Sequence, residues 1–238
     1  MGQNHLSRLA SPKNWKLARK ENKYITRPLA GPHPLSRCLT VNFLLKNLLN
    51  YAKTAKEVKN IINSGGLLID GVVRKDYKFP IGIMDIIELP KLKESYKLVF
   101  NKKGNFVLIP LDKDEQNTKL LKVIKKSIVK NGKLQITFHD GRNILLDKSD
   151  AKIGDSVLYD LKNKKINKLF SLDKGSFVYL VDGSYVGVIA KVKELVPSKD
   201  MKAAKLVLEI GDKDYITLRN YVFVVGNGKV EVGLEAKS

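Results

Sequence analysis

The feature that most constrains the fold is the alternation of short apolar runs with turn dipeptides through residues 91–228. Runs such as KLVF, NFVLIPL, KLQITF, FVYLV and KLVLEI are rich in β-branched and aromatic residues, which favour strands. Hairpin signals lie among them at Asn131-Gly132, Asp140-Gly141 and Asp182-Gly183, with Gly226-Asn227-Gly228 near the end. The pattern predicts many short antiparallel strands.

The segment LLKVIKKSIV, residues 120–129, fits either a helix or a strand by periodicity alone. Its β-branched residues and the Asn-Gly that follows favour a strand. A domain boundary near Phe170 is indicated by the lysine-rich sequence KNKKINK, where the excess of positive charge stops. We therefore predict a central β-rich domain over residues 91–170 and a further β domain over residues 171–238.

Residues 41–90 have a different pattern, typical of two helices followed by a hairpin. Apolar residues in VNFLLKNLLNYA recur at steps of three and four, which predicts an amphipathic helix over residues 41–52. Thr54 and Glu57 have the spacing of a capping box that starts a second helix, and Gly65-Gly66 ends it. LLIDGVVRK then indicates two strands joined by an Asp-Gly turn, and MDIIEL a third strand.

The first 40 residues form an arm that is rich in charge and proline. They carry 8 Lys or Arg residues and 1 acidic residue, so self-repulsion is expected to leave the arm poorly ordered alone in water. Pro28, Pro32 and Pro34 favour extended backbone, which suits a crevice in RNA. Trp15, the only tryptophan, is equally compatible with stacking among bases and with anchoring the arm to the protein's own body.

The charge balance indicates a polyanionic partner. The chain has 44 basic and 24 acidic residues, a net charge of +20, and most of the excess lies in residues 1–40 (+7) and 91–170 (+10). Such a field concentrates nucleic acid. A membrane partner is disfavoured because no long apolar run and no lipidation signal occurs. The absence of a signal peptide pattern and the single cysteine, Cys38, fit a reducing compartment, so a cytoplasmic location is expected.

No constellation of residues indicates catalysis or metal binding. His5, His33 and His139 lie far apart and Cys38 has no second cysteine, so no metal site is expected. The sequence holds no phosphate-binding loop, dinucleotide fingerprint or nucleophile elbow. Most acidic residues lie in turns or beside lysines, where turn chemistry explains them. We therefore expect no cofactor and no enzymatic activity.

These segments, in this order, resemble the archaeal and eukaryotic small-subunit ribosomal protein four, e-type. HLSRLASPKNWKLARK resembles that family's N-terminal signature, and GPHPLSRCL resembles the stretch that leads into its RNA-binding domain. TAKEVKNIINSGGLLIDGVVRKDYKFPIGIMDIIEL resembles its S-four domain, also called the α-L fold. FHDGRNI and RNYVFVVGNGK are similar to its central β domain and to the end of its KOW unit, an SH3-like barrel. VDGSYVGVI is shorter and less basic than the family's KOW loop, and Ser7 stands where the family usually has Lys.

The resemblance implies a multidomain α+β fold. Its parts would be an extended basic N-terminal arm over residues 1–40, an α-L RNA-binding domain over 41–90, a central β-rich domain over 91–170, and a C-terminal SH3-like KOW barrel with its tail over 171–238. It also implies a structural constituent of the small ribosomal subunit. The expected partners are small-subunit rRNA and neighbouring ribosomal proteins, with no membrane partner and no obligate homo-oligomer.

The candidate RNA-binding side chains lie in the arm, on the helix pair and hairpin, and in the central domain. The resemblance implies that the arm packs into rRNA and that Lys46 faces RNA, while the row of positive charge over residues 53–78 follows from the sequence itself. The candidates are His5, Arg8, Lys13, Trp15, Lys16, Arg19, Lys20, Arg27, Arg37, Lys46, Lys53, Lys56, Lys59, Arg74, Lys75, Lys78 and Arg142.

Two other classes of function stay open at this point. An RNA-modifying enzyme that carries an α-L domain would need a catalytic domain with an aspartate in a cleft, whereas the residues after Leu89 indicate small β units. A nucleic-acid-binding factor of KOW type would act away from the ribosome. Activity on RNA would reveal the enzyme, and sedimentation apart from ribosomal subunits would reveal the KOW-type factor.

Overall fold

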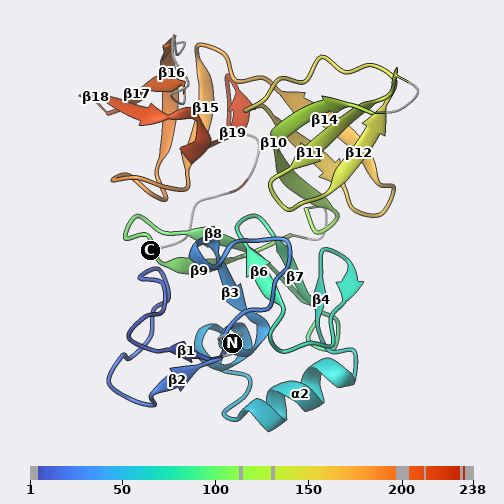
Figure 1. The fold of residues 1–238 in the computed structure, drawn as a ribbon, viewed down its shortest axis with the longest axis vertical. Coiled ribbons are helices and arrows are strands. Elements are labelled where there is room, and N and C mark those ends of the chain that lie inside the picture. The colour runs from blue at the N-terminus through green and yellow to red at the C-terminus, as the bar shows by residue number, and fades with distance from the viewer. Residues whose placement is uncertain are drawn as a thin grey trace. The chain divides into compact units, whose positions relative to one another are not determined.

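The computed structural model describes residues 5–112, 115–129, 132–196, 204–211, 213–230 and 233 (Figure 1). Its internal contacts divide the chain into two compact units. The N-terminal unit holds the described residues up to Val99 together with those of 105–119. The C-terminal unit holds Phe100–Gly104 and the described residues from Leu120 to Gly233. Strands predominate in both units, so the expected α+β class is corrected to a mostly-β protein of several domains.

The N-terminal unit contains three small sheets. Their strands are β1 (Leu6–Ser7), β2 (Tyr24–Ile25), β3 (Cys38–Thr40), β4 (Leu68–Ile69), β5 (Val72–Val73), β6 (Pro80–Gly82), β7 (Ile86–Leu89), β8 (Glu94–Phe100) and β9 (Phe106–Pro110). The largest sheet has the order β5-β4-β7-β8-β9, while β1 pairs with β2 and β3 with β6. Thus β8 and β9, which follow the predicted α-L segment (residues 41–90) in the sequence, belong to the same sheet as its strands β4, β5 and β7.

The first helical segment is shorter than the sequence predicts. It consists of α1 (Val41–Phe43) and the π-helix η2 (Leu44–Leu48), where the backbone N–H of Leu49 donates to the carbonyl of Leu44 at 3.0 Å. Asn50 then has a φ of +56°. A left-handed residue cannot continue a right-handed helix, so the expected helix over residues 41–52 is too long. A 3-10 turn, η1 (Leu35–Arg37), precedes β3.

The second helix, α2 (Ala55–Asn63), begins at the predicted capping box. The backbone N–H of Glu57 donates to the Thr54 hydroxyl at 3.2 Å, and the Glu57 carboxylate accepts from the backbone N–H of Lys53 at 2.8 Å. These reciprocal bonds satisfy amide donors that a helix start leaves without partners. The capping box is therefore confirmed.

The predicted hairpin after α2 is also confirmed. β4 and β5 pair antiparallel through Ile69 and Val72. Asp70 and Gly71 between them have φ values of +52° and +73°, the backbone that a two-residue turn of type I′ requires.

The arm is folded onto the N-terminal unit over residues 5–40. Leu6 of β1 pairs with Ile25 of β2. Asn14 accepts a hydrogen bond from the backbone N–H of Phe106 at 3.2 Å through its carbonyl, and Trp15 is only 2% exposed. The expectation of an extended arm is corrected for these residues, because apolar side chains such as Leu6 and Trp15 are buried within the unit.

The C-terminal unit contains two five-stranded antiparallel sheets. The first has the order β12-β11-β10-β13-β14 and the second β18-β17-β16-β15-β19. A 3-10 turn, η4 (Arg219–Tyr221), joins the last two strands. The strand bounds are β10 (Thr118–Ile128), β11 (Leu134–Phe138), β12 (Asn143–Leu146), β13 (Ser156–Asp160), β14 (Lys165–Phe170), β15 (Ser176–Leu180), β16 (Ile189–Val196), β17 (Lys205–Ile210), β18 (Lys213–Leu218) and β19 (Val222–Asn227). The ambiguous segment 120–129 is thus a strand through Ile128, as predicted.

Two of the four hairpin signals lie in short connections between directly paired neighbouring strands. β10 pairs with β11 on either side of Asn131-Gly132, of which Asn131 lies outside the described residues. Asp140-Gly141 joins β11 to β12, with the backbone N–H of Phe138 donating to the carbonyl of Arg142 at 2.9 Å. Both signals support the antiparallel order that the sequence predicts.

The other two signals do not form short hairpin turns. Asp182-Gly183 lies in a longer connection, residues 181–188, between β15 and β16, which pair directly with each other. Gly226 lies inside β19, opposite Phe177, beside a register shift typical of a bulge. Glycine marks a bulge or a close backbone approach as well as a turn, which is why the dipeptide pattern misleads here.

Candidate nucleic-acid interface

A groove of about 680 Å³ runs along one side of the N-terminal unit, between α2 and the segment that follows β5. Lys59 and Asn63 line it from α2, and Arg74, Lys75, Tyr77 and Phe79 line it from the other side. The capping box fixes the start of α2 and the Asp70-Gly71 turn fixes the hairpin, so local sequence positions both walls. The result is a concave surface that combines basic groups with aromatic rings.

Two of the three basic groups that line this groove lie over aromatic rings. The Arg74 guanidinium is 4.4 Å from the centroid of the Phe79 ring, and the Lys59 ammonium is 4.8 Å from that of Tyr77. The Lys78 ammonium, which does not line the groove, lies 5.7 Å from the Tyr77 centroid. Cation–π attraction holds these cations against the aromatic rings that line the groove, and the cations can at the same time bind phosphate groups. Sequence reasoning missed Tyr77, Phe79 and Asn63, although RKDYKF interleaves basic and aromatic residues.

A second polar pocket, of about 380 Å³, lies between the arm and the first helical segment. Arg8, Lys46 and Lys53 line it together with Glu21 and three asparagines, Asn22, Asn47 and Asn50. The Arg8 guanidinium donates to the Ala18 carbonyl at 2.7 Å and pairs with Glu21 at 2.8 Å. Arg8 therefore stabilises the arm's own fold, and Lys46 and Lys53 are the other two cations that line this pocket.

The other predicted residues of the arm are spread over its surface. Lys13, Lys16, Lys20 and Arg27 are exposed, as is Lys56 on α2, while Arg37 is half-buried. Arg19 donates to the Leu9 carbonyl at 3.0 Å. The His5 ring lies 5.1 Å from that of Tyr24, and the Lys23 ammonium lies 5.4 Å from the Tyr24 centroid. This exposed tyrosine was not among the predicted site residues.

Trp15 is removed from the set of base-stacking candidates. Its indole N–H donates to the carbonyl of Cys38 at 2.8 Å, and its ring lies 5.0 Å from that of Phe43. With 2% of its surface exposed, it offers no face to a base. Of the two interpretations that the sequence left open, the structure supports the anchor.

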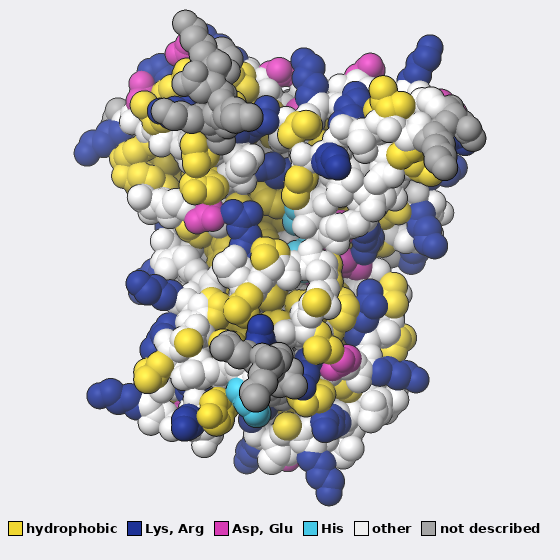
Figure 2. All heavy atoms as spheres, viewed as in Figure 1, with side chains coloured by type: hydrophobic (Ala, Val, Ile, Leu, Met, Phe, Trp, Pro, Cys, Tyr) yellow, Lys and Arg dark blue, Asp and Glu magenta, His cyan; other side chains and the backbone are white. Residues whose placement is uncertain are grey.

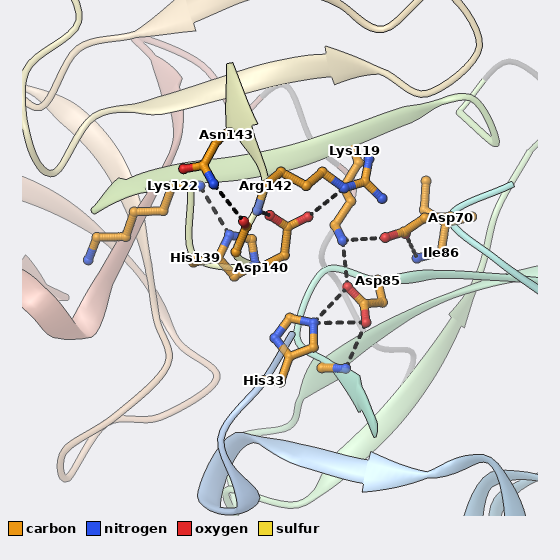
Figure 3. A network of polar contacts seen from close by, with 12 residues as sticks. His33, Asp70, Asp85, Ile86, Lys119, Lys122, His139, Asp140, Arg142 and Asn143 are labelled. Carbon is orange, nitrogen blue, oxygen red and sulfur yellow. Dashed lines mark hydrogen bonds and ion pairs between the residues drawn. The ribbon is translucent and has the colours of Figure 1, made fainter. Parts of the chain in front are cut away.

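A buried network of charged residues attaches the later part of the arm to the unit (Figure 3). His33 from the arm contacts Asp85 at 3.0 Å, and the Lys119 ammonium contacts Asp85 at 2.5 Å and Asp70 at 2.6 Å. The Asp85 carboxylate also accepts from the backbone N–H of Gly82 at 2.8 Å. A Cβ atom at Gly82 would lie 2.2 Å from the His33 ring, so only glycine allows this approach.

The network keeps Asp85 ionised. Burial alone would raise its pKa, but the charges of Lys119 and His33 and their hydrogen bonds hold the pKa of Asp85 well below its usual range. Burial, and secondarily Asp85, raises the pKa of the neighbouring Cys38 thiol to about 12. Cys38 is therefore a neutral core residue and not a reactive thiolate. The network's role is structural, because it attaches His33 of the arm to the rest of the N-terminal unit, which also contains the α2 groove.

Arg142 belongs to the C-terminal unit, whereas the residues described above belong to the N-terminal unit. Its side chain pairs with Asp140 at 3.0 Å and is 32% exposed. Its guanidinium lies 5.7 Å from the centroid of the Tyr159 ring. Within the N-terminal unit, the structure brings together Lys59, Arg74 and Lys75 in one groove and Lys46 and Lys53 in another pocket.

Two absences hold for the described part of the chain. It contains no group of three or more His, Cys, Asp or Glu side chains arranged to hold a metal ion. Among the helices described there, none has the length and apolar character needed to cross a membrane.

A basic, aromatic groove on a helix pair and hairpin, preceded by a cationic arm and followed by small β domains, defines a multidomain nucleic-acid-binding protein. Models of known families match three successive parts of the chain. Residues 1–36 match the RS4NT (NUC023) domain, residues 42–87 match the S4 domain, and residues 92–166 match the ribosomal family S4e.

Curated relatives match along almost the whole chain. The "Small ribosomal subunit protein eS4" of Methanococcus aeolicus is 39% identical over 97% of both chains, and that of Methanocaldococcus jannaschii is 37% identical over 94% of both. The crystal structure of the 30S ribosomal protein S4e from Thermoplasma acidophilum is similar with a TM-score of 0.69 and 27% identity, covering 80% of this chain and 96% of that one. The chain belongs to the ribosomal protein S4e family.

Proposed function

We propose that the chain is a structural constituent of the small ribosomal subunit, held there by rRNA that lies along the α2 groove and the arm. The observation that carries this proposal is the groove itself, where Lys59, Arg74 and Lys75 lie beside Tyr77 and Phe79. Family membership supports it, because the relatives are named as small-subunit proteins. The expectation of a non-enzymatic protein agrees with membership of a ribosomal protein family.

The mechanism is electrostatic and steric. Each Lys or Arg that neutralises a phosphate releases counterions, and such contacts position a protein on RNA without reading its sequence. Tyr77 and Phe79 add flat surfaces on which an unstacked base of single-stranded rRNA can lie. The arm contributes exposed cations at Lys13, Lys16 and Lys20.

The division into functional parts is proposed as follows. Residues 1–40 are the arm, 41–90 the α-L RNA-binding part, 91–170 the central β part, and 171–238 an SH3-like barrel of the KOW type. The sheet order β18-β17-β16-β15-β19, with η4 between its last two strands in sequence, supports the barrel. We place the protein in the cytoplasm, on the ribosome, with rRNA and ribosomal proteins as partners and no obligate homo-oligomer.

The test is the salt dependence of binding to small-subunit rRNA fragments. Lys59→Gln, Arg74→Gln and Lys75→Gln are each expected to weaken binding and to reduce the slope of log K against log salt by about 0.7–0.9. Lys133→Gln is the matched control, because Lys133 is exposed in the C-terminal unit and lies outside the groove. Unchanged affinity and slope in all three groove variants would show that RNA does not lie there.

A further inference from the structure

The C-terminal unit has a groove that the RNA-binding proposal does not use. It measures about 270 Å³ and lies between the connection from β15 to β16, strands β17 and β18, and η4. Tyr185, Tyr215 and Tyr221 contribute three aromatic rings to its lining, and Leu208 contributes to its apolar floor. Figure 2 shows hydrophobic side chains gathered on the surface where Figure 1 draws β17 and β18.

The groove is preformed. The Tyr185 and Tyr215 rings lie 4.2 Å apart, and a hydrogen bond between their side chains raises the pKa of Tyr185. Tyr185 lies in the connection between β15 and β16. A hydrogen bond ties the two ends of this connection together, because the backbone N–H of Gly187 donates to the Leu180 carbonyl at 2.8 Å. A Cβ atom at Gly187 would lie 2.3 Å from the Asn101 carbonyl oxygen, so close packing fixes this wall.

The charge of the groove does not suit a polyanion. Its lining includes one acidic side chain, Asp182, and one basic side chain, Lys205. Residues 171–238 carry 10 basic and 9 acidic residues, within a chain whose net charge is +20. Electrostatic complementarity therefore favours a partner segment that is itself close to neutral.

The edge of the sheet adds backbone groups to the same surface. Within the described residues β18 pairs only with β17, so its outer edge has no second strand. Tyr215, Ile216, Thr217 and Leu218 of this edge strand all line the groove. Ile216 is 72% exposed and Tyr185 38% exposed, an apolar surface of the kind that marks interaction sites.

We propose that this groove binds an extended, uncharged segment of a neighbouring protein, with proline side chains packed against the exposed faces of the tyrosine rings. Aromatic-lined grooves recognise proline-rich segments because the polyproline II conformation is already extended and loses little entropy on binding. Tyrosine hydroxyls can donate to the backbone carbonyls that this conformation leaves free. That the neighbour is a protein of the small subunit rests on the proposed function. That the groove can bind an uncharged, extended segment rests only on its lining residues.

The first test measures binding of a ten-residue polyproline peptide to the full-length chain. Saturable binding is expected that changes little with salt and weakens by about tenfold or more in Tyr185→Ala and Tyr215→Ala, as for aromatic hot spots. Tyr24→Ala is the control, since Tyr24 is 50% exposed but lies in the arm. Absence of saturable binding, or equal affinity in the groove variants and the control, would overturn the proposal.

The second test finds the occupant in the assembled particle. A photo-cross-linking residue replaces the exposed Ser184 at the groove rim, and small subunits that contain the full-length chain are irradiated. Cross-linking to an extended proline-containing segment of a protein is expected. Cross-linking to rRNA, or to nothing, contradicts the proposal. Sedimentation of the same particles through a density gradient reports independently whether the chain is part of the small subunit, so failure of this proposal can be distinguished from failure of the proposed function.

Discussion

The attachment of the arm depends on single buried residues, and Trp15 is the largest of them. The side chain fills a site against Phe43 and satisfies the Cys38 carbonyl. Trp15→Ala is expected to lower the free energy of unfolding of the N-terminal unit by about 3–5 kcal/mol, because it leaves a cavity and an unpaired carbonyl. Urea denaturation measures this. Lys13→Ala, at an exposed position, is the control; a stable Trp15→Ala variant that only binds RNA less well would contradict the anchor role.

Lys119 is the residue on which the buried network depends. Its ammonium lies between Asp70 and Asp85, and its side chain is fully buried. Lys119→Met removes the cation and leaves two buried carboxylates with less compensation, so a loss of about 3–5 kcal/mol in the free energy of unfolding is expected. The matched control is Lys125→Met, at an exposed position. A loss no larger than that of the control would show that the network is dispensable.

The same network predicts how stability depends on acid. Because the folded pKa of Asp85 lies below its unfolded value, its stabilising contribution is fully present above about pH 4 and is lost as the pH falls toward the lower folded pKa. Chemical denaturation across this range is expected to show a smaller acid loss in Asp85→Asn than in the wild type. Asp112→Asn, at an exposed position, should retain the wild-type profile, and an unchanged profile in Asp85→Asn would refute the assignment.

Among the elements, α2 carries one wall of the RNA groove and depends on its first turn. Thr54→Ala removes the hydroxyl that accepts from the Glu57 backbone N–H, so a loss of about 1 kcal/mol is expected. Amide hydrogen exchange of Ala55–Asn63 is expected to rise, whereas Thr54→Ser retains the acceptor and the protection. Equal exchange in both variants would mean that packing alone holds the helix start.

Elements with a local signal could be predicted from the sequence, and those fixed by distant contacts could not. The Thr54-Glu57 capping box and the Asp70-Gly71 turn form within a few residues, so pattern alone identifies them. The network joins His33 to Asp85 across 52 positions and Lys119 to Asp85 across 34, which no local pattern reveals. The burial of Trp15 also depends on contacts that are distant in the sequence, so local pattern could not predict it. Tyr77 and Phe79, in contrast, lie in the local sequence RKDYKF, whose alternation of basic and aromatic residues could have identified them as candidates.

For the whole molecule, the distribution of charge separates two kinds of surface. The net charge of +20 is concentrated before residue 171, and the last 68 residues are nearly neutral. The α2 groove and the arm offer cations to phosphate, while the tyrosine-lined groove offers an apolar, neutral surface. A chain of this kind is expected to join RNA to protein within one particle, since the two surfaces differ in the chemistry that each can bind.

Many phosphate contacts are expected to hold the chain in the small ribosomal subunit. The most direct measurement is sedimentation of the tagged full-length protein from cell lysate at moderate and at high salt, with rRNA detected across the gradient. Retention in the small-subunit peak through the high-salt wash is predicted, because buried phosphate contacts exchange with salt far less readily than surface ones. Recovery of the protein free of the small subunit at moderate salt would contradict the account.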